Sequence, residues 1–90
     1  MKIFEYKRIG GKLISVSFNY SDSIFSEVKI YGDFFIFPED AIEILEKSIE
    51  GKTYIELPET INNFLSLGIR FYGITKDDLM EVFKGAINEK

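Results

Sequence analysis

Apolar and polar residues alternate along the first third of the chain, and this alternation predicts β-strands. The clearest case is residues 12–20, KLISVSFNY, in which apolar residues occupy every second position from the third onward, with serine and asparagine between them. A period of two places these two kinds of side chain on opposite faces of a strand. Residues 2–9 fit a strand more weakly, and Gly10-Gly11 can adopt the positive φ angles of a tight hairpin between the two.

A further β-rich run occupies residues 24–31, IFSEVKIY. The polar residues 21–23 supply a short turn before it, so the three runs predict an antiparallel meander. One face of this strand is expected to be apolar and the opposite face charged. The expected apolar face comprises Ile24, Val28 and Ile30, and the charged face comprises Glu27 and Lys29.

Beyond residue 37 the apolar residues recur at three- and four-residue spacing, which predicts helices. The first is expected over residues 38–51, with a proline at the first helical position and a glycine at its end. A shorter helix is expected over residues 58–68. Thr75 and Asp78 have the spacing of a capping box and predict the start of a third. The stripes expected to be buried comprise Ala41, Ile42, Leu45 and Ile49; Ile61, Phe64 and Leu65; and Leu79, Val82, Phe83 and Ala86.

These elements predict one α+β domain over residues 1–90, a small antiparallel three-stranded sheet with helices packed on one face. The chain has 90 residues and is 46% hydrophobic, which fits a globular protein with a modest core. It contains no linker, repeat or low-complexity tract. No apolar run is long enough to cross a bilayer and no signal-peptide pattern follows Met1, so the protein is expected to be cytoplasmic.

The composition removes most catalytic chemistry. The chain has no cysteine and no histidine, which excludes thiolate nucleophiles, disulfides and the usual general base and metal ligand. Phosphate-loop, dinucleotide, GxSxG and HExxH motifs are absent as well. We therefore assign no catalytic and no metal-ligating residue. The acidic residues of the first predicted helix are expected to form a solvated face: Glu39, Asp40, Glu43, Glu46 and Glu50.

Charge is distributed unevenly along the sequence. Residues 1–12 contain four basic residues and one acidic residue, a net charge of +3, so the remaining residues carry −7 of a total of −4. A basic edge therefore adjoins an acidic body, and the overall sign disfavours nucleic-acid binding. Lys12 lies beside a glycine turn, where it either presents a positive charge to a phosphate or is simply solvated.

The segment KIYGDFFIFP, residues 29–38, concentrates aromatic residues at one bend. Gly32 is expected to adopt backbone angles closed to other residues, and Asp33 either holds the turn through backbone N–H groups or contacts a ligand. Neighbours in an extended stretch point to opposite sides, so the four apolar residues 34–37 cannot all face one small core. Either they pack in the core as far as geometry allows, or some form a partner interface.

Several of these features together resemble the C-terminal accessory domain of lipoate-protein ligases, over nearly the whole chain. The most specific part is Gly-Asp-Phe-Phe after a β-run. The residues that carry the resemblance are Gly10, Gly11 and Lys12 before an alternating strand, Glu27, Lys29 to Phe35, Pro38, and Ile49, Glu50 and Gly51 at a helix end. The resemblance implies a fold similar to the SufE and IscU class, whose members work through cysteines that this chain lacks.

The resemblance also implies a role and partners. The catalytic domain of that family is absent here, so the chain resembles the small subunit of a split, archaeal-type ligase. Such a subunit is needed with the catalytic subunit for ATP-dependent activation of lipoate to lipoyl-AMP, rather than for transfer to the lipoyl carrier protein. It binds no cofactor alone; ATP and lipoate, with Mg²⁺, bind in the complex.

The resemblance assigns two groups of residues in this picture. The partner-binding residues would be Gly32, Asp33, Phe34, Phe35 and Phe37, and the residues near the nucleotide or acyl-adenylate would be Gly11 and Lys12. Two other classes remain open at this point. One is a free-standing protein-interaction or regulatory module with no role in lipoate chemistry, and the other is a small enzyme in its own right.

Overall fold

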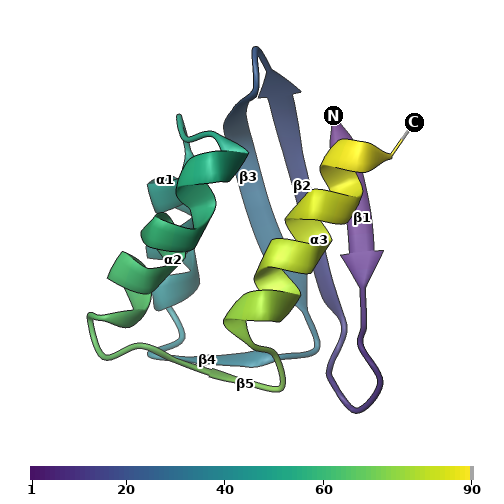
Figure 1. The fold of residues 1–90 in the computed structure, drawn as a ribbon. Helices are drawn as coiled ribbons and strands as arrows, with labels where there is room; N and C mark the ends of the chain where they lie inside the picture. Colours follow the sequence, from purple (N-terminus) through teal and green to yellow (C-terminus); the bar gives the residue numbers. More distant parts are fainter. Residues whose placement is uncertain (90) are drawn as a thin grey trace.

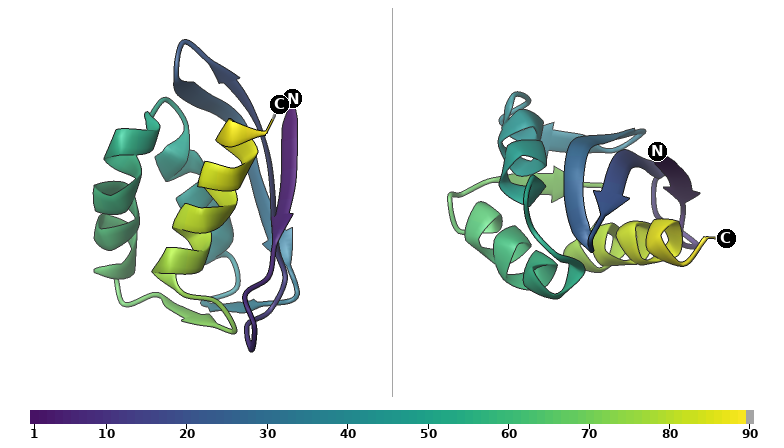
Figure 2. Two further views of the ribbon diagram at one scale, coloured as in Figure 1. Left: turned by 45° about the vertical axis from the view of Figure 1, so that its right-hand side comes forward. Right: turned by 90° about the horizontal axis from the view of Figure 1, so that it is seen from above.

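The computed structural model describes residues 1–89 and has the predicted α+β architecture (Figure 1). Three antiparallel strands form a sheet in the order β1-β2-β3, and the helices lie on one side of it (Figure 2). The strands of this sheet are β1 (Lys2–Tyr6), β2 (Ile14–Ser21) and β3 (Ile24–Gly32). The helices are α1 (Ala41–Ile49), the short 3₁₀ helix η1 (Tyr54–Glu56), α2 (Leu57–Leu65) and α3 (Lys76–Asn88).

The core lies between the sheet and the helices. The predicted alternation of β2 is confirmed, since Ile14, Val16 and Phe18 are fully buried. Helix α3 crosses β1 and β2, helix α1 lies along β3, and α2 packs against the other two helices. The predicted stripe of α3 is buried throughout, from Leu79 to Ala86. Within the described residues no helix has the length and apolar character needed to span a membrane.

Strand β3 departs from the predicted face because it contains a β-bulge. Ile24, expected inside, is 42% exposed, and Phe25 is buried in its place. The register between β2 and β3 shifts by one residue between Ser17 and Asn19, and Glu27 has a φ of 52°. One extra residue in β3 inverts the facing of every residue on its N-terminal side. The expectation for Ile24 was therefore wrong, whereas Val28 and Ile30 are buried as predicted.

The helix boundaries are close to those predicted, with one correction. Helix α1 begins at Ala41, so Pro38 is not its first residue; it lies in the preceding turn, where its carbonyl accepts a hydrogen bond from the Ala41 N–H at 3.0 Å. Gly51 closes α1 with a φ of 79°, as expected of a glycine after a helix end. The capping box of Thr75 and Asp78 at the start of α3 is confirmed, with both reciprocal hydrogen bonds present.

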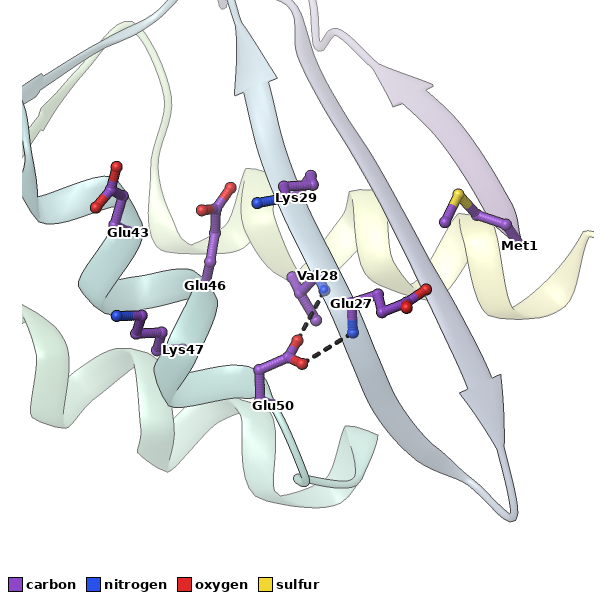
Figure 3. Close-up of a pocket in the computed structure, with 8 residues that line it drawn as sticks. All are labelled: Met1, Glu27, Val28, Lys29, Glu43, Glu46, Lys47 and Glu50. Carbon is purple, nitrogen blue, oxygen red and sulfur yellow. Dashed lines mark hydrogen bonds between the residues drawn. The ribbon is translucent and has the colours of Figure 1, made fainter.

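The carboxylates of α1 do not simply form the solvated face that the sequence predicted. Both oxygens of Glu50 accept backbone hydrogen bonds from β3, from Glu27 N–H at 2.8 Å and Val28 N–H at 2.7 Å (Figure 3). Glu46 accepts a third from Ile30 N–H at 2.7 Å. These N–H groups lie on the outer edge of β3, where no further strand of the sheet pairs with them. Helix α1 therefore satisfies an otherwise unpaired sheet edge with its side chains.

Replacing Glu50 with alanine is expected to lower the free energy of unfolding by about 1–3 kcal/mol, because two backbone N–H groups lose a charged acceptor. Chemical denaturation measures this loss. Glu43 is on the same helix but accepts no hydrogen bond within residues 1–89. Glu43→Ala is therefore the matched control and should cost only about 0.3–1 kcal/mol, from its interaction with the helix dipole in the first turn of α1. Equal losses for the two variants would contradict a capping role for Glu50.

Candidate docking site

A two-stranded ribbon, separate from the main sheet, lies across one end of the molecule (Figure 1). Strand β4 (Phe35–Phe37) comes from the aromatic bend, and β5 (Arg70–Tyr72) from the connection between α2 and α3. They pair antiparallel, with Phe35 opposite Tyr72 and Phe37 opposite Arg70. Residues 70–72 were not predicted to form a strand, so this pairing was not predicted.

The side chains of the ribbon alternate between two sides, as expected for an extended stretch. Phe35 is 74% exposed, Phe37 64% and Tyr72 53%. The intervening Ile36 and Phe71 are half-buried against the core. We use the term aromatic face for Phe35, Phe37 and Tyr72 together with the exposed Arg70. Core packing alone does not describe the bend, and neither does a partner interface alone, because one set of side chains belongs to the core and the other lies in solvent.

Phe34 lies on the core side of the bend. Its ring packs edge-on to that of Phe71 at a centroid distance of 6.4 Å, and Phe71 in turn lies 6.1 Å from Phe64 of α2. The bend is thus anchored to the helical layer through aromatic contacts. Among the predicted partner-binding phenylalanines, Phe35 and Phe37 offer far more accessible surface than the half-buried Phe34.

The turn at Gly32 and Asp33 holds the bend against the first hairpin. Gly32 has a φ of 150°, and a Cβ at this position would lie 2.2 Å from the Leu13 carbonyl oxygen, so no other residue fits. The Asp33 N–H donates to that same oxygen at 3.0 Å. Within residues 1–89 the exposed Asp33 carboxylate accepts no hydrogen bond. The expectation that Gly32 adopts a conformation closed to other residues is confirmed. The turn is held by a backbone hydrogen bond rather than by the Asp33 side chain.

Lys12 is brought to the end of the ribbon by Gly73. Its N–H donates to the Gly73 carbonyl at 2.9 Å, and its Cγ would lie 2.5 Å from a Cβ at Gly73. The side chain of Lys12 is exposed, whereas Gly11 is buried. The structure therefore joins two regions that the sequence presented separately, the basic hairpin and the aromatic bend.

Arg70 and Tyr72 are the members of this surface that the sequence analysis did not assign. Their signal was present, since they alternate with Ile69 and Phe71, but the alternation is too short to reveal a pairing partner. Tyr72 lies directly across from Phe35, so two exposed aromatic side chains are neighbours at that position. Arg70 adds a cation beside Phe37, a combination enriched in protein interfaces.

An open groove of about 650 Å³ lies between α1 and β3 (Figure 3). Its Glu50 and Glu46 carboxylates already bind the β3 backbone. Within residues 1–89 no cluster of acidic side chains could hold a metal ion. An exposed aromatic face of this kind is suited to docking on a partner.

Comparison with known proteins agrees in sequence and in structure. The family model described as the bacterial lipoate protein ligase C-terminus matches residues 2–83. The chain is 29% identical over 72 residues to lipoate-protein ligase A subunit 2 of Thermoplasma acidophilum, covering 80% of this chain and 77% of that relative. It is also similar to a solved chain from an archaeal lipoylation system, a bi-partite lipoate protein ligase and its E2 lipoyl domain from the same organism. That similarity has a TM-score of 0.84 and 28% identity, and covers 91% of this chain and 92% of the other.

Proposed function

The chain belongs to the lipoate protein ligase C-terminus family, and from this premise we propose that it is the accessory subunit of a two-component lipoate-protein ligase. Its similarity to subunit 2 of an archaeal ligase, and to a chain of a bi-partite ligase structure, supports a separate small subunit. The catalytic subunit would be its direct partner, and a lipoyl carrier protein would meet the pair at the transfer step. The pair would work in the cytoplasm, where ATP is supplied.

The observation that carries this proposal is the aromatic face. Phe35, Phe37 and Tyr72 each expose more than half of their surface on one two-stranded ribbon. Exposed contiguous apolar surface of this kind is costly in water and marks an interface. We propose that the catalytic subunit covers it, with Gly32 and Asp33 shaping the bend that presents the phenylalanines.

The two subunits would divide the work of lipoate activation. The catalytic subunit would bind ATP, lipoate and Mg²⁺, and this chain would contribute no catalytic group. The accessory subunit would help to close the site, exclude water and hold the lipoate carboxylate against the α-phosphate, which is the kind of positioning that accelerates a reaction. Lys12 and the adjacent Gly11 would lie near the anionic nucleotide or acyl-adenylate, at the edge of the interface.

Reconstitution tests this function. The catalytic subunit of the same organism is mixed with ATP, Mg²⁺ and lipoate, and pyrophosphate release is measured as this chain is added. We expect release to rise with the concentration of the chain and then to saturate. Transfer from preformed lipoyl-AMP to the carrier protein should not require the chain, which provides the internal control.

Two outcomes would overturn the proposal. No stimulation at a saturating concentration of the chain would remove the accessory role. Binding to the catalytic subunit without any change in pyrophosphate release would instead indicate an interaction module that takes no part in activation. A heat-denatured sample of the chain controls for contaminating activity.

A further inference from the structure

The two edges of the main sheet differ in whether other segments of the chain cover them. The outer edge of β3 is covered along its length: Glu46 and Glu50 accept three of its N–H groups, and Phe25 exchanges backbone hydrogen bonds with Gly51 and Lys52 at 2.8 and 3.0 Å. The outer edge of β1 has no such cover, because its only backbone partner within residues 1–89 is β2. Figure 1 shows β1 at the margin of the sheet. One edge is closed and the other is open for pairing.

The side chains of β1 are also incompletely covered. Phe4 and Tyr6 face the core but are only half-buried, and Ile3 on the other face is 58% exposed. A strand added beside β1 would pair its free backbone groups and cover these side chains on both faces. Strand addition to an exposed edge is an established mode of recognising an extended segment.

The charge on β1 and on the hairpin after it indicates which kind of segment could pair with this edge. Lys2, Lys7 and Lys12 have no ion-pair partner within the described residues, whereas Arg8 is held by Asp78 at 3.0 Å. The one acidic residue of β1, Glu5, accepts a hydrogen bond from Ser15 of β2 at 3.3 Å, and residues 2–12 carry a net charge of +3 with Glu5 included. Two copies of the chain paired through β1 would each bring a segment of net charge +3 to the interface, and like charges at paired edges are destabilising. An acidic extended segment would complement the same lysines.

The open edge is continuous with the proposed interface. The hairpin after β1 leads to Lys12, whose N–H binds the Gly73 carbonyl at the end of the ribbon. We propose, on the basis of the function proposed above, that β1 accepts an acidic, extended segment of the catalytic subunit as a fourth strand. The catalytic subunit would then hold this chain by backbone pairing at β1 and by aromatic contacts at the ribbon.

Hydrogen exchange of the full chain in its complex with the catalytic subunit tests this pairing. The outward-pointing amides of residues 2–6 should exchange at least about tenfold more slowly in the complex than in the free chain, because they gain hydrogen-bond partners. The matched control is residues 26–31 of β3, whose outer edge is already covered and whose exchange should change little. Pyrophosphate release is measured on the same complex.

The outcomes separate the pairing from the function. Normal stimulation of pyrophosphate release with unchanged exchange at residues 2–6 would overturn the pairing and leave the accessory role intact. Failure to form any complex would overturn both. Slower exchange at rising concentration of the chain alone would assign the edge to a second copy, which also contradicts the proposal.

A pair of charge reversals tests the acidic nature of the segment. Lys7→Glu, immediately after β1, is expected to weaken the complex roughly three- to tenfold at low salt. Lys84→Glu makes the same change in net charge at an exposed position of α3 and should have little effect. Equal weakening by both variants would show a response to overall charge only and would overturn the acidic segment.

Discussion

Phe35→Ala is expected to raise the dissociation constant of the complex with the catalytic subunit roughly thirtyfold, corresponding to about 2 kcal/mol for a central aromatic contact. The expectation follows from its position, because Phe35 is 74% exposed and lies directly across from Tyr72 in the aromatic face. Isothermal titration calorimetry or surface plasmon resonance gives the two dissociation constants. The melting temperature of the isolated chain should change little, since few of the atoms of Phe35 are buried by folding.

The control for this experiment is another exposed apolar residue. Ile55 in η1 is 88% exposed and belongs to no part of the aromatic face. Ile55→Ala should bind as tightly as the natural sequence. If Phe35→Ala instead melted at a much lower temperature and its folded fraction bound normally, Phe35 would be a core residue and the aromatic face would not be the docking surface.

Asp78→Ala is expected to destabilise the chain by about 2–4 kcal/mol, because this one carboxylate serves two structural roles. It accepts the Thr75 N–H at 2.9 Å and so caps α3, and both of its oxygens lie 3.0 Å from the Arg8 Nε. Asp78 is only 3% exposed. Its removal would leave the guanidinium of Arg8 and the first turn of α3 without their partner.

Thermal unfolding measures this effect. In a domain of this size a loss of 1 kcal/mol lowers the melting temperature by roughly 4–8 °C, so a drop of about 8–30 °C is expected. Asp77 is the matched control, since it lies in the same first turn of α3 but is exposed and unpaired within residues 1–89. Asp77→Ala should cost about 1 kcal/mol or less, from its interaction with the helix dipole alone. Similar losses for both would rule out the double role of Asp78.

The contact between Arg8 and Asp78 also bears on the proposed docking surfaces. It ties the hairpin after β1 to the start of α3 across 70 positions of sequence. Gly73, at the end of β5, binds Lys12 of the same hairpin. The hairpin after β1 therefore connects the C-terminal end of that strand to the aromatic face, and Asp78→Ala is expected to loosen this connection.

The sequence by itself determined the features that depend on near neighbours. The period of β2, the capping box of Thr75 and Asp78, the glycine at position 32 and the opposite facing of residues along the bend all follow from rules that span a few residues. For that reason the α+β class, most element positions and the division of residues 34–37 between two sides of the bend were predictable. The similarity of the bend and its flanking residues to a known family pointed to the same docking role.

The tertiary structure alone decided the features that join distant segments. Tyr72 and Arg70 reach the aromatic face only because β5 pairs with β4, more than thirty positions earlier. Glu50 became a cap of β3 because α1 lies along that edge, and a bulge at Glu27 exchanged Ile24 for Phe25 in the core. Local period and propensity carry no information about which distant strand or helix will be adjacent, since that choice rests on how the whole chain buries its apolar surface.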